Sequence, residues 1–364
     1  MTANWFSLAE KPYTEDDAAW DDFVANHPHG SILQTTNWAR LKNRFGWSSE
    51  RVWLKRDGAL AAGAQILYRS ALLGIFKVGY IAHGPLVDWN DDEQIAVLMG
   101  QIDESAYKNG AGIIKMEPLL WQNEISADRW RDICEENDLL MTADTIQPPR
   151  TIIVDISPAE EEILAAMKSK TRYNIRLSAR KDVVVRQGTG EDLNAFADLM
   201  QTTGQRDGFG THEPEYYATM FSFFAPDNAV LLIAEFEEKP LAAAMITALG
   251  DTAVYLYGAS SNEERNRMPA YAVQWAAMQW AKERGCMRYD LWGVPDASEE
   301  KLEEQFTERS DGLWGVYRAK RGYGGQVQRT VGVVDRVYNN RLYKLYNWYR
   351  GRQKRGEQPG ARSK

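Results

Sequence analysis

The sequence predicts an α/β (α+β) protein with two tandem domains, each built on a mixed sheet. The chain has 364 residues, which is long enough for two domains, and its 44% hydrophobic and 26% charged content is ordinary for a globular protein. One order of strands, helix and helix-ending glycine occurs twice along the chain. The length and the repetition together favour a duplicated domain.

The first copy of this order begins with two strands, predicted over 58–68 and 80–88. A long amphipathic helix follows from Asp91, because its apolar residues recur three and four positions apart. Gly110 is the expected helix stop, and the apolar segment 111–118 then reads as a buried strand.

The second copy repeats the order with a low sequence identity to the first. Its strands, helix and last strand are predicted over 240–249, 253–261, 269–285 and 286–294. Tyr80 then corresponds to Tyr255, and Gly110 corresponds to Gly285, with the same distance along the chain between the two members of each pair. The predicted duplication therefore depends on order, spacing and the two helix-stop glycines.

A helix-led mixed sheet with a late strand, helix and strand is the arrangement of the N-acyltransferase (GNAT-like) fold. Members that use acetyl-coenzyme A carry a glycine-rich pyrophosphate loop between the fourth strand and its helix. The corresponding joints, 83–94 and 258–270, lack that loop, and the glycine-rich stretch 107–113 follows a helix instead of opening one. Coenzyme A is therefore disfavoured as donor, and we expect no resident cofactor.

Several features bear on compartment and metal binding. The N-terminal stretch lacks the basic start and apolar core of a signal peptide, and no apolar run approaches the roughly 20 residues of a membrane span, so we expect a cytoplasmic protein. Cys134 and Cys286 stand in unlike contexts and are expected to be reduced core thiols. The four histidines show no metal-ligand spacing with them, and no metal site is expected.

Positive charge is concentrated in two stretches, although the net charge of the chain is −8. One is the tail from Arg336 onward, and the other is 168–186. The second stretch follows a predicted helix start at Ser157, and four of its cations share one helix face by their four-residue spacing. These four are Lys168, Arg172, Arg176 and Arg180. Such a surplus attracts phosphates, and the alternative is a solvated helix face.

Six segments together resemble the FemABX family, whose members transfer amino acids from aminoacyl-tRNA onto peptidoglycan precursors. They occur in the family's order over nearly the whole chain. Their positions are 34–47, 113–118, 170–185, 205–217, 254–260 and 316–327. Each segment alone is a weak signal, whereas the combination is specific.

The resemblance implies a first GNAT-like domain over 1–148 that is completed by 332–356, and a second over 149–331. Residues 357–364 are expected to be disordered. The long helical arm of the staphylococcal bridge-building members has no counterpart here, because the second-copy helix runs directly into its strand after Gly285. The chain is in this respect similar to the compact, FemX-like type.

The implied reaction is aminolysis of the aminoacyl ester at the 3′ end of tRNA by an amine of the stem peptide. The amine must lose a proton, and the developing oxyanion needs positive or hydrogen-bonding groups. The resemblance assigns Glu117 to binding or deprotonating the amine and Lys320 to the tRNA terminus and the negative charge. The alternative for Glu117 is a strand-end carboxylate paired with a neighbouring cation. Ala319 replaces the aromatic residue that usually precedes the lysine, which bears on the shape of the donor pocket.

The resemblance also assigns Lys42 and Arg206 to the phosphates of the precursor and Tyr257 to a hydroxyl contact with it. The alternative for Lys42 and Arg206 is an exposed charge at a helix end, and the alternative for Tyr257 is an ordinary aromatic residue of the sheet core. The cations of 168–181 would border a groove for tRNA or for the nucleotide part of the precursor, which is either UDP-linked or lipid-linked muramyl pentapeptide.

The basic, aromatic tail has three interpretations: packing on the first domain, contact with tRNA, or peripheral contact with an anionic membrane. We expect its aromatics to pack and its basic face to be solvated, with membrane contact as a hypothesis. Two rival functions are an N-acyltransferase that modifies an exopolysaccharide or another cell-envelope intermediate from an acyl thioester, and a noncatalytic RNA-binding protein. The sequence does not define the donated amino acid.

Overall fold

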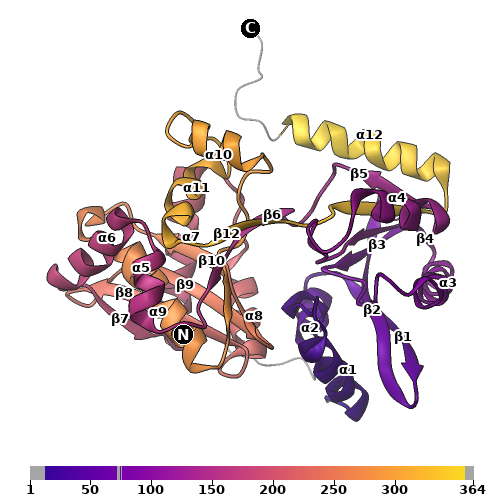
Figure 1. The fold of residues 1–364 in the computed structure, drawn as a ribbon, viewed down its shortest axis with the longest axis horizontal. Coiled ribbons are helices and arrows are strands. Elements are labelled where there is room, and N and C mark those ends of the chain that lie inside the picture. The colour runs from indigo at the N-terminus through magenta and orange to yellow at the C-terminus, as the bar shows by residue number, and fades with distance from the viewer. Residues whose placement is uncertain (1–12, 72–73, 75, 357–364) are drawn as a thin grey trace, which may run out of the picture.

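Two mixed sheets lie side by side, and helices pack on each of them (Figure 1). The structure is a computed structural model that describes residues 13–71, 74 and 76–356. The predicted α/β fold with two mixed sheets is confirmed for this part of the chain. The segment 357–364, for which we predict disorder, lies outside the described residues.

The first sheet has the strand order β1-β2-β3-β4-β13-β5, with β3 and β4 parallel and the other neighbours antiparallel. Its strands are β1 (Ser48–Arg56), β2 (Ala59–Ala71), β3 (Phe76–Ala82), β4 (Ala111–Glu117), β5 (Leu139–Thr142) and β13 (Val333–Val337). The helices of this half are α1 (Glu15–Asn26), α2 (Thr36–Arg44), α3 (Asp92–Asn109), α4 (Ala127–Glu136) and α12 (Asn340–Gly356), with the 3₁₀ turn η1 (Ile32–Gln34).

The second sheet has the order β12-β6-β11-β10-β9-β8-β7, with β10 and β11 parallel. Its strands are β6 (Arg150–Asp155), β7 (Val184–Gln187), β8 (Ala229–Phe236), β9 (Lys239–Leu249), β10 (Thr252–Ser260), β11 (Arg288–Asp290) and β12 (Gln326–Arg329). Its α-helices are α5 (Glu160–Ala166), α6 (Ser169–Arg180), α7 (Leu193–Asp207), α8 (Pro214–Phe224), α9 (Pro269–Glu283), α10 (Glu299–Gln305) and α11 (Trp314–Lys320). Its 3₁₀ turns are η3 (Gly190–Asp192), η4 (Arg265–Arg267) and η5 (Arg321–Tyr323).

The predicted repetition is confirmed in strand order and pairing. In the first half, α3 connects the parallel strands β3 and β4, and in the second half α9 connects the parallel strands β10 and β11. Gly110 and Gly285 both have left-handed backbone, with φ of 66° and 83°, which glycine adopts without a side-chain clash. β11 begins at Arg288, soon after α9 ends, so no helical arm separates them.

β13 belongs to the first sheet although β12, which precedes it in the chain, belongs to the second. The chain thus returns to its first half near residue 332. We keep the exact domain boundaries, at 148/149 and 331/332, as a proposal.

The helix predicted to run from Ser157 through the cations is wrong as one element, because two helices occupy the stretch. α5 begins after the N-cap Ala159, and the Ser157 hydroxyl instead donates to Asp155 at 2.7 Å. The break lies at Met167 and Lys168, which both have extended backbone. Lys168 N–H donates to the carbonyl of Gly322 at 2.9 Å, a tertiary bond that a continuous helix would not allow.

The C-terminal helix α12 packs on the first sheet through its aromatics, as predicted. The Tyr346 ring is edge-to-face with Phe76 at 6.1 Å between centroids, and the Tyr343 hydroxyl donates to Asp335 at 2.9 Å. Trp348 points outward with 54% of its surface exposed. Within the described part of the chain, no helix is long and apolar enough to cross a bilayer.

Candidate active site

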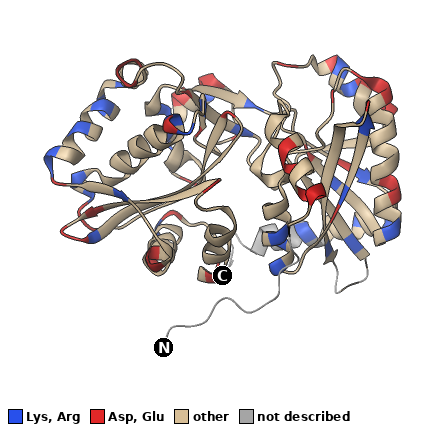
Figure 2. Cartoon of the chain, turned by 90° about the horizontal axis from the view of Figure 1, so that it is seen from below, with Lys and Arg blue, Asp and Glu red and all other residues tan. Residues whose placement is uncertain are grey.

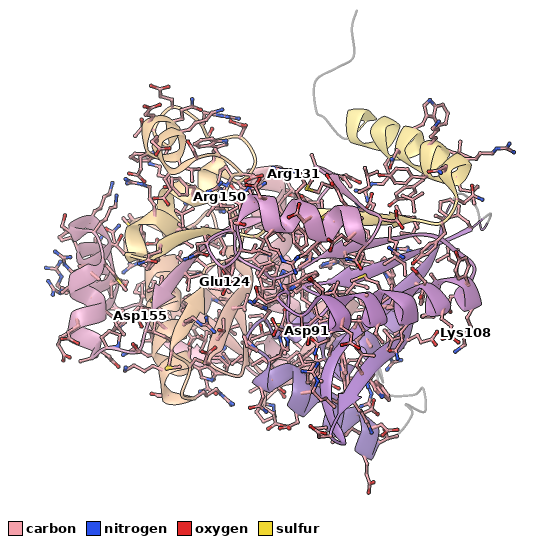
Figure 3. All side chains as sticks on the ribbon, turned by 45° about the vertical axis from the view of Figure 1, so that its right-hand side comes forward. Asp91, Lys108, Glu124, Arg131, Arg150 and Asp155 are labelled. Atoms are coloured by element: carbon pink, nitrogen blue, oxygen red, sulfur yellow. The ribbon has the colours of Figure 1, made fainter. Side chains whose placement is uncertain are left out.

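A cavity of about 520 Å³ lies between the two sheets and is lined by residues of both. Ser31, His83 and Glu124 reach it from the first half. Asp155 and Trp292 reach it from the second half. Glu124 and Asp155, one from each half, are labelled in Figure 3. A cleft of this size between two folded units is a common place for a ligand.

The parallel strands β10 and β11 separate at the edge of this cavity. Their pairing covers three residues on each strand and ends at Val254 and Asp290. Both residues line the cavity. Open sheets bind ligands beyond the carboxyl ends of parallel strands, and this opening is such a position.

Asp290 lies at this opening, and Lys320 lies close enough that the charge of each residue shifts the pKa of the other. The Asp290 carboxylate is 7% exposed and accepts hydrogen bonds from the Thr151 hydroxyl and from Trp292 N–H at 2.7 Å. Burial raises its pKa, against these hydrogen bonds and the Lys320 charge. Sequence reasoning missed Asp290, although it ends a buried strand as Glu117 does.

The Lys320 ammonium donates to two backbone carbonyls, those of Trp292 at 3.2 Å and Gly293 at 2.8 Å. Burial lowers the Lys320 pKa to about 8, while the nearby Asp290 carboxylate acts in the opposite direction. Ala319 is exposed, and the Tyr255 ring lies 5.9 Å from the Lys320 ammonium instead. A cation with shifted pKa beside a buried carboxylate and a cavity is a candidate catalytic group.

Glu117 ends β4 and is 5% exposed. Its carboxylate accepts from the Tyr80 hydroxyl, from Ile146 N–H at 2.5 Å and from Gln147 N–H at 3.0 Å. Burial raises its pKa, and these three hydrogen bonds act against the rise. The cation nearest in sequence, Lys115, pairs with Asp335 at 2.8 Å, and its charge also lowers the Glu117 pKa.

One short segment connects the two predicted catalytic residues. Glu117 holds the backbone of Ile146 and Gln147, and the next residue, Pro148, packs against Gly293 so closely that a Cβ there would lie 2.5 Å from its ring. Gly293 in turn provides a carbonyl to Lys320. A continuous set of contacts, through residues 146–148 and Gly293, therefore joins Glu117 to Lys320.

The family resemblance assigns Lys42 and Tyr257 to the precursor, and both side chains lie next to a third residue, Tyr216. The Lys42 ammonium lies 2.8 Å from the Tyr216 hydroxyl, which in turn lies 3.5 Å from the Tyr257 hydroxyl. His212 stacks on the Tyr216 ring at 3.8 Å between centroids. Sequence reasoning missed Tyr216 and His212, although both stand in the segment 205–217 that carries the family resemblance.

Arg206 lies near the end of α7, and its guanidinium contacts several groups. It pairs with Asp207 through two hydrogen bonds of 2.8 and 2.9 Å, and it donates to the Ser260 carbonyl at 3.0 Å. Hydrogen bonding to Asp207 raises its pKa, so it remains a cation. A phosphate at Arg206 would compete with the Asp207 carboxylate.

The predicted row of four cations is reduced to three by the helix break. α6 lies at the outer side of the second half (Figure 1), and Lys and Arg positions recur along it (Figure 2). Arg172, Arg176 and Arg180 of this helix line a shallow groove with Tyr173. Lys168 is the N-cap of α6 and lies 3.7 Å from Glu303. The Arg172 guanidinium donates to the carbonyls of Ala165 (3.1 Å) and Met167 at the end of α5.

The duplicated order of strands and helices, with parallel strands that separate at a cavity in the second half, defines a tandem GNAT-like fold. The family model for the FemAB family matches residues 16–239 and 235–350, and the chain belongs to this family. Its relatives are named as glycyltransferases, which makes it an enzyme of the aminoacyltransferase class.

Two curated relatives are named lipid II:glycine glycyltransferase. The protein from Staphylococcus haemolyticus (strain JCSC1435) is 27% identical over 400 residues, and the protein from Staphylococcus aureus (strain USA300) is 26% identical over 402 residues. Each comparison covers 89% of this chain and 92% of the relative.

Solved structures show the same fold. The crystal structure of FemX has a TM-score of 0.82 with 23% identity and covers 93% of this chain and 99% of that chain. A tandem GNAT protein from the clavulanic acid biosynthesis pathway has a TM-score of 0.54 with 10% identity, over 90% and 97% of the two chains.

Proposed function

We propose that this protein transfers an amino acid from aminoacyl-tRNA to the stem-peptide amine of a peptidoglycan precursor, in cross-bridge synthesis. The observation that carries the proposal is the buried Lys320 ammonium, which donates to the carbonyls of Trp292 and Gly293 behind Asp290 and Trp292, two residues that line a cavity shared by both sheets. Membership of the FemAB family and the names of the staphylococcal relatives support it.

The proposed reaction forms one amide bond and breaks one ester bond. The ammonium form of the amine, which has an ordinary pKa of about 10.4 when lysine-like, gives up one proton to the Glu117 carboxylate directly or through the substrate. The neutral nitrogen attacks the ester carbonyl, and the Lys320 ammonium stabilises the oxyanion. Collapse breaks the bond to the 3′ oxygen of the tRNA ribose, which takes up the second proton that the nitrogen loses, and the first proton passes from Glu117 to solvent.

The precursor would bind with its phosphates at the Lys42 ammonium and its polar groups at the Tyr216 and Tyr257 hydroxyls. A point cation suits a phosphate, and the hydroxyls add donors beside it. The relatives' names favour a lipid-linked acceptor, such as the lipid II of those proteins, over a UDP-linked one. The groove on α6 would attract tRNA phosphates through Arg176 and Arg180.

We further propose that the protein acts at the cytoplasmic face of the membrane and touches it through α12. Leu345 and Trp348 are 41% and 54% exposed, and Arg341 and Lys344 lie on the same helix. An exposed apolar pair beside cations suits an anionic lipid surface.

The test is a transfer assay with purified protein. Mixed aminoacyl-tRNA would be supplied with lipid-linked and, separately, UDP-linked muramyl pentapeptide, and the acceptor would be weighed by mass spectrometry. We expect a gain of one amino-acid residue that ribonuclease abolishes and that a folded Lys320→Met variant loses. No gain with either acceptor would contradict the proposal and favour a cell-envelope acyltransferase that uses another donor.

A further inference from the structure

The Asp290 carboxylate uses only one of its two oxygens within the protein. The Thr151 hydroxyl and the Trp292 N–H both donate to Oδ1, and no hydrogen bond in the described part of the chain uses Oδ2. Asp290 is 7% exposed and lines the cavity between the two sheets. Burial raises its pKa, because the charged form has lost the hydration that it has in water. A cation at Oδ2 would compensate for this loss.

Lys320 does not take the position at Oδ2. Trp292 has a left-handed backbone, with φ of 61°, and it directs its N–H to Asp290 and its carbonyl to the Lys320 ammonium. That ammonium also donates to the Gly293 carbonyl at 2.8 Å. Lys320 therefore acts on Asp290 through its charge, while Oδ2 stays open to a donor from a ligand.

A second polar atom of the same cavity wall has no partner in the described chain. Thr247 is fully buried and lines the cavity, and its hydroxyl makes no hydrogen bond to the described residues. Val254 pairs with Thr247 on one side and with Asp290 on the other, so all three side chains share one face of the second sheet. Buried polar atoms are normally paired, and a polar ligand at this face would pair with both residues.

The charge of the cavity wall favours a cationic ligand group. Its carboxylates are those of Glu124, Asp155, Asp251 and Asp290. Arg288 is the one lysine or arginine among the described residues that line it, and its guanidinium donates to Asp251 at 2.7 Å. Burial lowers the pKa of His27 and of His83 to about 4, so both rings are neutral near pH 7. The wall is therefore anionic, and an ammonium group complements it.

We propose that Asp290 Oδ2 binds the α-ammonium of the aminoacyl group on the donor tRNA, so that the site selects an aminoacyl ester over an ester that lacks this charge. This inference rests on the proposed function, which supplies the donor. An α-amino group has an ordinary pKa of about 8, so it is largely a cation at pH 7, and it lies one carbon from the ester carbonyl. The acceptor amine, in contrast, is neutral when it attacks. A carboxylate that holds an ammonium therefore suits the donor and fixes the carbon next to the reacting carbonyl.

The experiment measures the binding of two acceptor-stem RNA hairpins to the full-length protein. One hairpin carries alanine at its 3′ end through an amide bond, which is not activated for transfer. The other carries lactic acid through the same bond, so that a hydroxyl replaces the ammonium. Fluorescence anisotropy gives the two Kd values, and thermal melting establishes that each variant is folded.

Asp290→Asn is the test variant because it changes only the free side of the group. Its amide oxygen can still accept from Thr151 and Trp292, while an NH₂ group takes the place of Oδ2. Asp155→Asn is the matched control, since Asp155 is another carboxylate of the same cavity wall.

We expect the wild-type protein to bind the alanyl hairpin about 10-fold or more tightly than the lactyl hairpin near pH 6.5, as one charge-assisted hydrogen bond predicts. In Asp290→Asn the two Kd values should agree within about 2-fold, whereas Asp155→Asn should keep the wild-type ratio. The wild-type preference should fade between about pH 7 and pH 9, because the ammonium loses its proton there. The lactyl hairpin corrects for any titration of Lys320 over the same range.

Four results would overturn the inference. They are equal binding of both hairpins by the wild-type protein, a preference that stays constant up to pH 9, an unchanged preference in folded Asp290→Asn, and an equal loss in Asp155→Asn. If Asp290→Asn does not fold, Asp290→Glu should lower the preference, because it displaces the carboxylate by one methylene, and an unchanged preference in Asp290→Glu overturns the inference.

The transfer assay separates this inference from the proposed function. A wild-type protein that transfers an amino acid but binds both hairpins equally keeps the proposed function and loses the role of Asp290. A wild-type protein that transfers no amino acid from any aminoacyl-tRNA rejects the proposed function, and the role of Asp290 falls with it.

Discussion

The Lys42 ammonium of α2 lies 2.8 Å from the Tyr216 hydroxyl of α8, so a cation of the first half meets a phenol of the second. The same ammonium lies 4.7 and 4.9 Å from the ring centroids of Trp38 and Tyr216. These contacts leave its positive charge without a compensating carboxylate among the partners described for it. Burial, followed by the Arg69 charge, lowers the Lys42 pKa to about 8.

This pKa predicts a pH-dependent affinity for a phosphate-bearing precursor. Lys42 is charged below about pH 8 and neutral above it, so the affinity for UDP-linked muramyl pentapeptide should fall between about pH 7 and pH 9. Loss of one charge-assisted hydrogen bond costs about 1.5–3 kcal/mol, which is roughly 10-fold or more in Kd. Calorimetric titration at several pH values measures this.

Lys42→Arg is the matched variant, because a guanidinium keeps its charge throughout this range. Its Kd should vary little between the same pH values, since the diphosphate diester of the ligand does not titrate there. A wild-type Kd that is constant with pH, or a Kd that rises as steeply with pH in Lys42→Arg, contradicts the assignment of Lys42 to the phosphates.

Glu117 gives a prediction that separates a catalytic base from a structural carboxylate. The Tyr80 hydrogen bond lowers the Glu117 pKa, so Tyr80→Phe should raise it. A base acts in its deprotonated form, and the acidic limb of the pH–rate profile should therefore move to higher pH in Tyr80→Phe. The folded protein should lose only about 1 kcal/mol of stability, the typical net value of one hydrogen bond.

Glu117→Gln tests the same role by a different route. An amide has one acceptor oxygen and no charge, so the variant should lose transfer and about 1–3 kcal/mol of stability through its contacts with Ile146 and Gln147. An acidic limb that stays in place in Tyr80→Phe, together with near-normal transfer by folded Glu117→Gln, would leave Glu117 a structural carboxylate.

The fold could be predicted from the sequence because its signals are local. The apolar spacing of α3, its N-cap Asp91 and its stop at Gly110 each act within a few residues. The break between α5 and α6 could not be predicted in this way, because the N–H of Lys168 bonds to Gly322, far along the chain. Capping residues at Ser157 suggested a helix start, and tertiary packing determined the real one.

The sequence predicted individual residues of the candidate site but not the way in which they come together. Lys42 and Tyr257 could be named from a resemblance, but Tyr216 joins them only through packing of the two halves. Trp292 gave no sequence signal, since its unusual feature is a backbone angle. The Arg206 pair differs, because its partner Asp207 is the next residue in the sequence.

The buried pair of Lys115 and Asp335 predicts a large stability effect. Their side chains are 1% and 2% exposed and lie 2.8 Å apart. Lys115→Met should lower the free energy of unfolding by about 3–5 kcal/mol, because it leaves the Asp335 carboxylate buried without its cation. Lys115→Met combined with Asp335→Leu should recover much of this loss in urea denaturation.

An exposed pair provides the control for this measurement. Lys108 is 71% exposed and lies 2.7 Å from Glu50, and Lys108→Met should cost far less stability than Lys115→Met, because solvent screens an exposed pair. Equal losses at the two lysines, or a double variant no more stable than Lys115→Met, would show that charge burial is not the cause.

The α6 groove predicts a change in the salt dependence of tRNA binding. Arg176→Gln and Arg180→Gln should each weaken binding and reduce the slope of log K against log salt by about one. Lys168→Gln should change the slope less, because its ammonium lies 3.7 Å from Glu303. Fluorescence anisotropy at several salt concentrations measures the affinity and the slope. If the slope is the same in all three variants, the α6 groove does not bind tRNA.

The exposed face of α12 predicts binding to anionic vesicles. Trp348→Ala should reduce co-sedimentation with phosphatidylglycerol vesicles several-fold, because the indole supplies apolar area at the lipid interface. Truncation after Asn347 should reduce it further and flatten its dependence on salt. Met287→Ala is the control, since Met287 is 50% exposed but belongs to the second half. Binding that survives the truncation unchanged, or that Met287→Ala weakens equally, argues that α12 is a packing element of the first sheet and not a membrane contact.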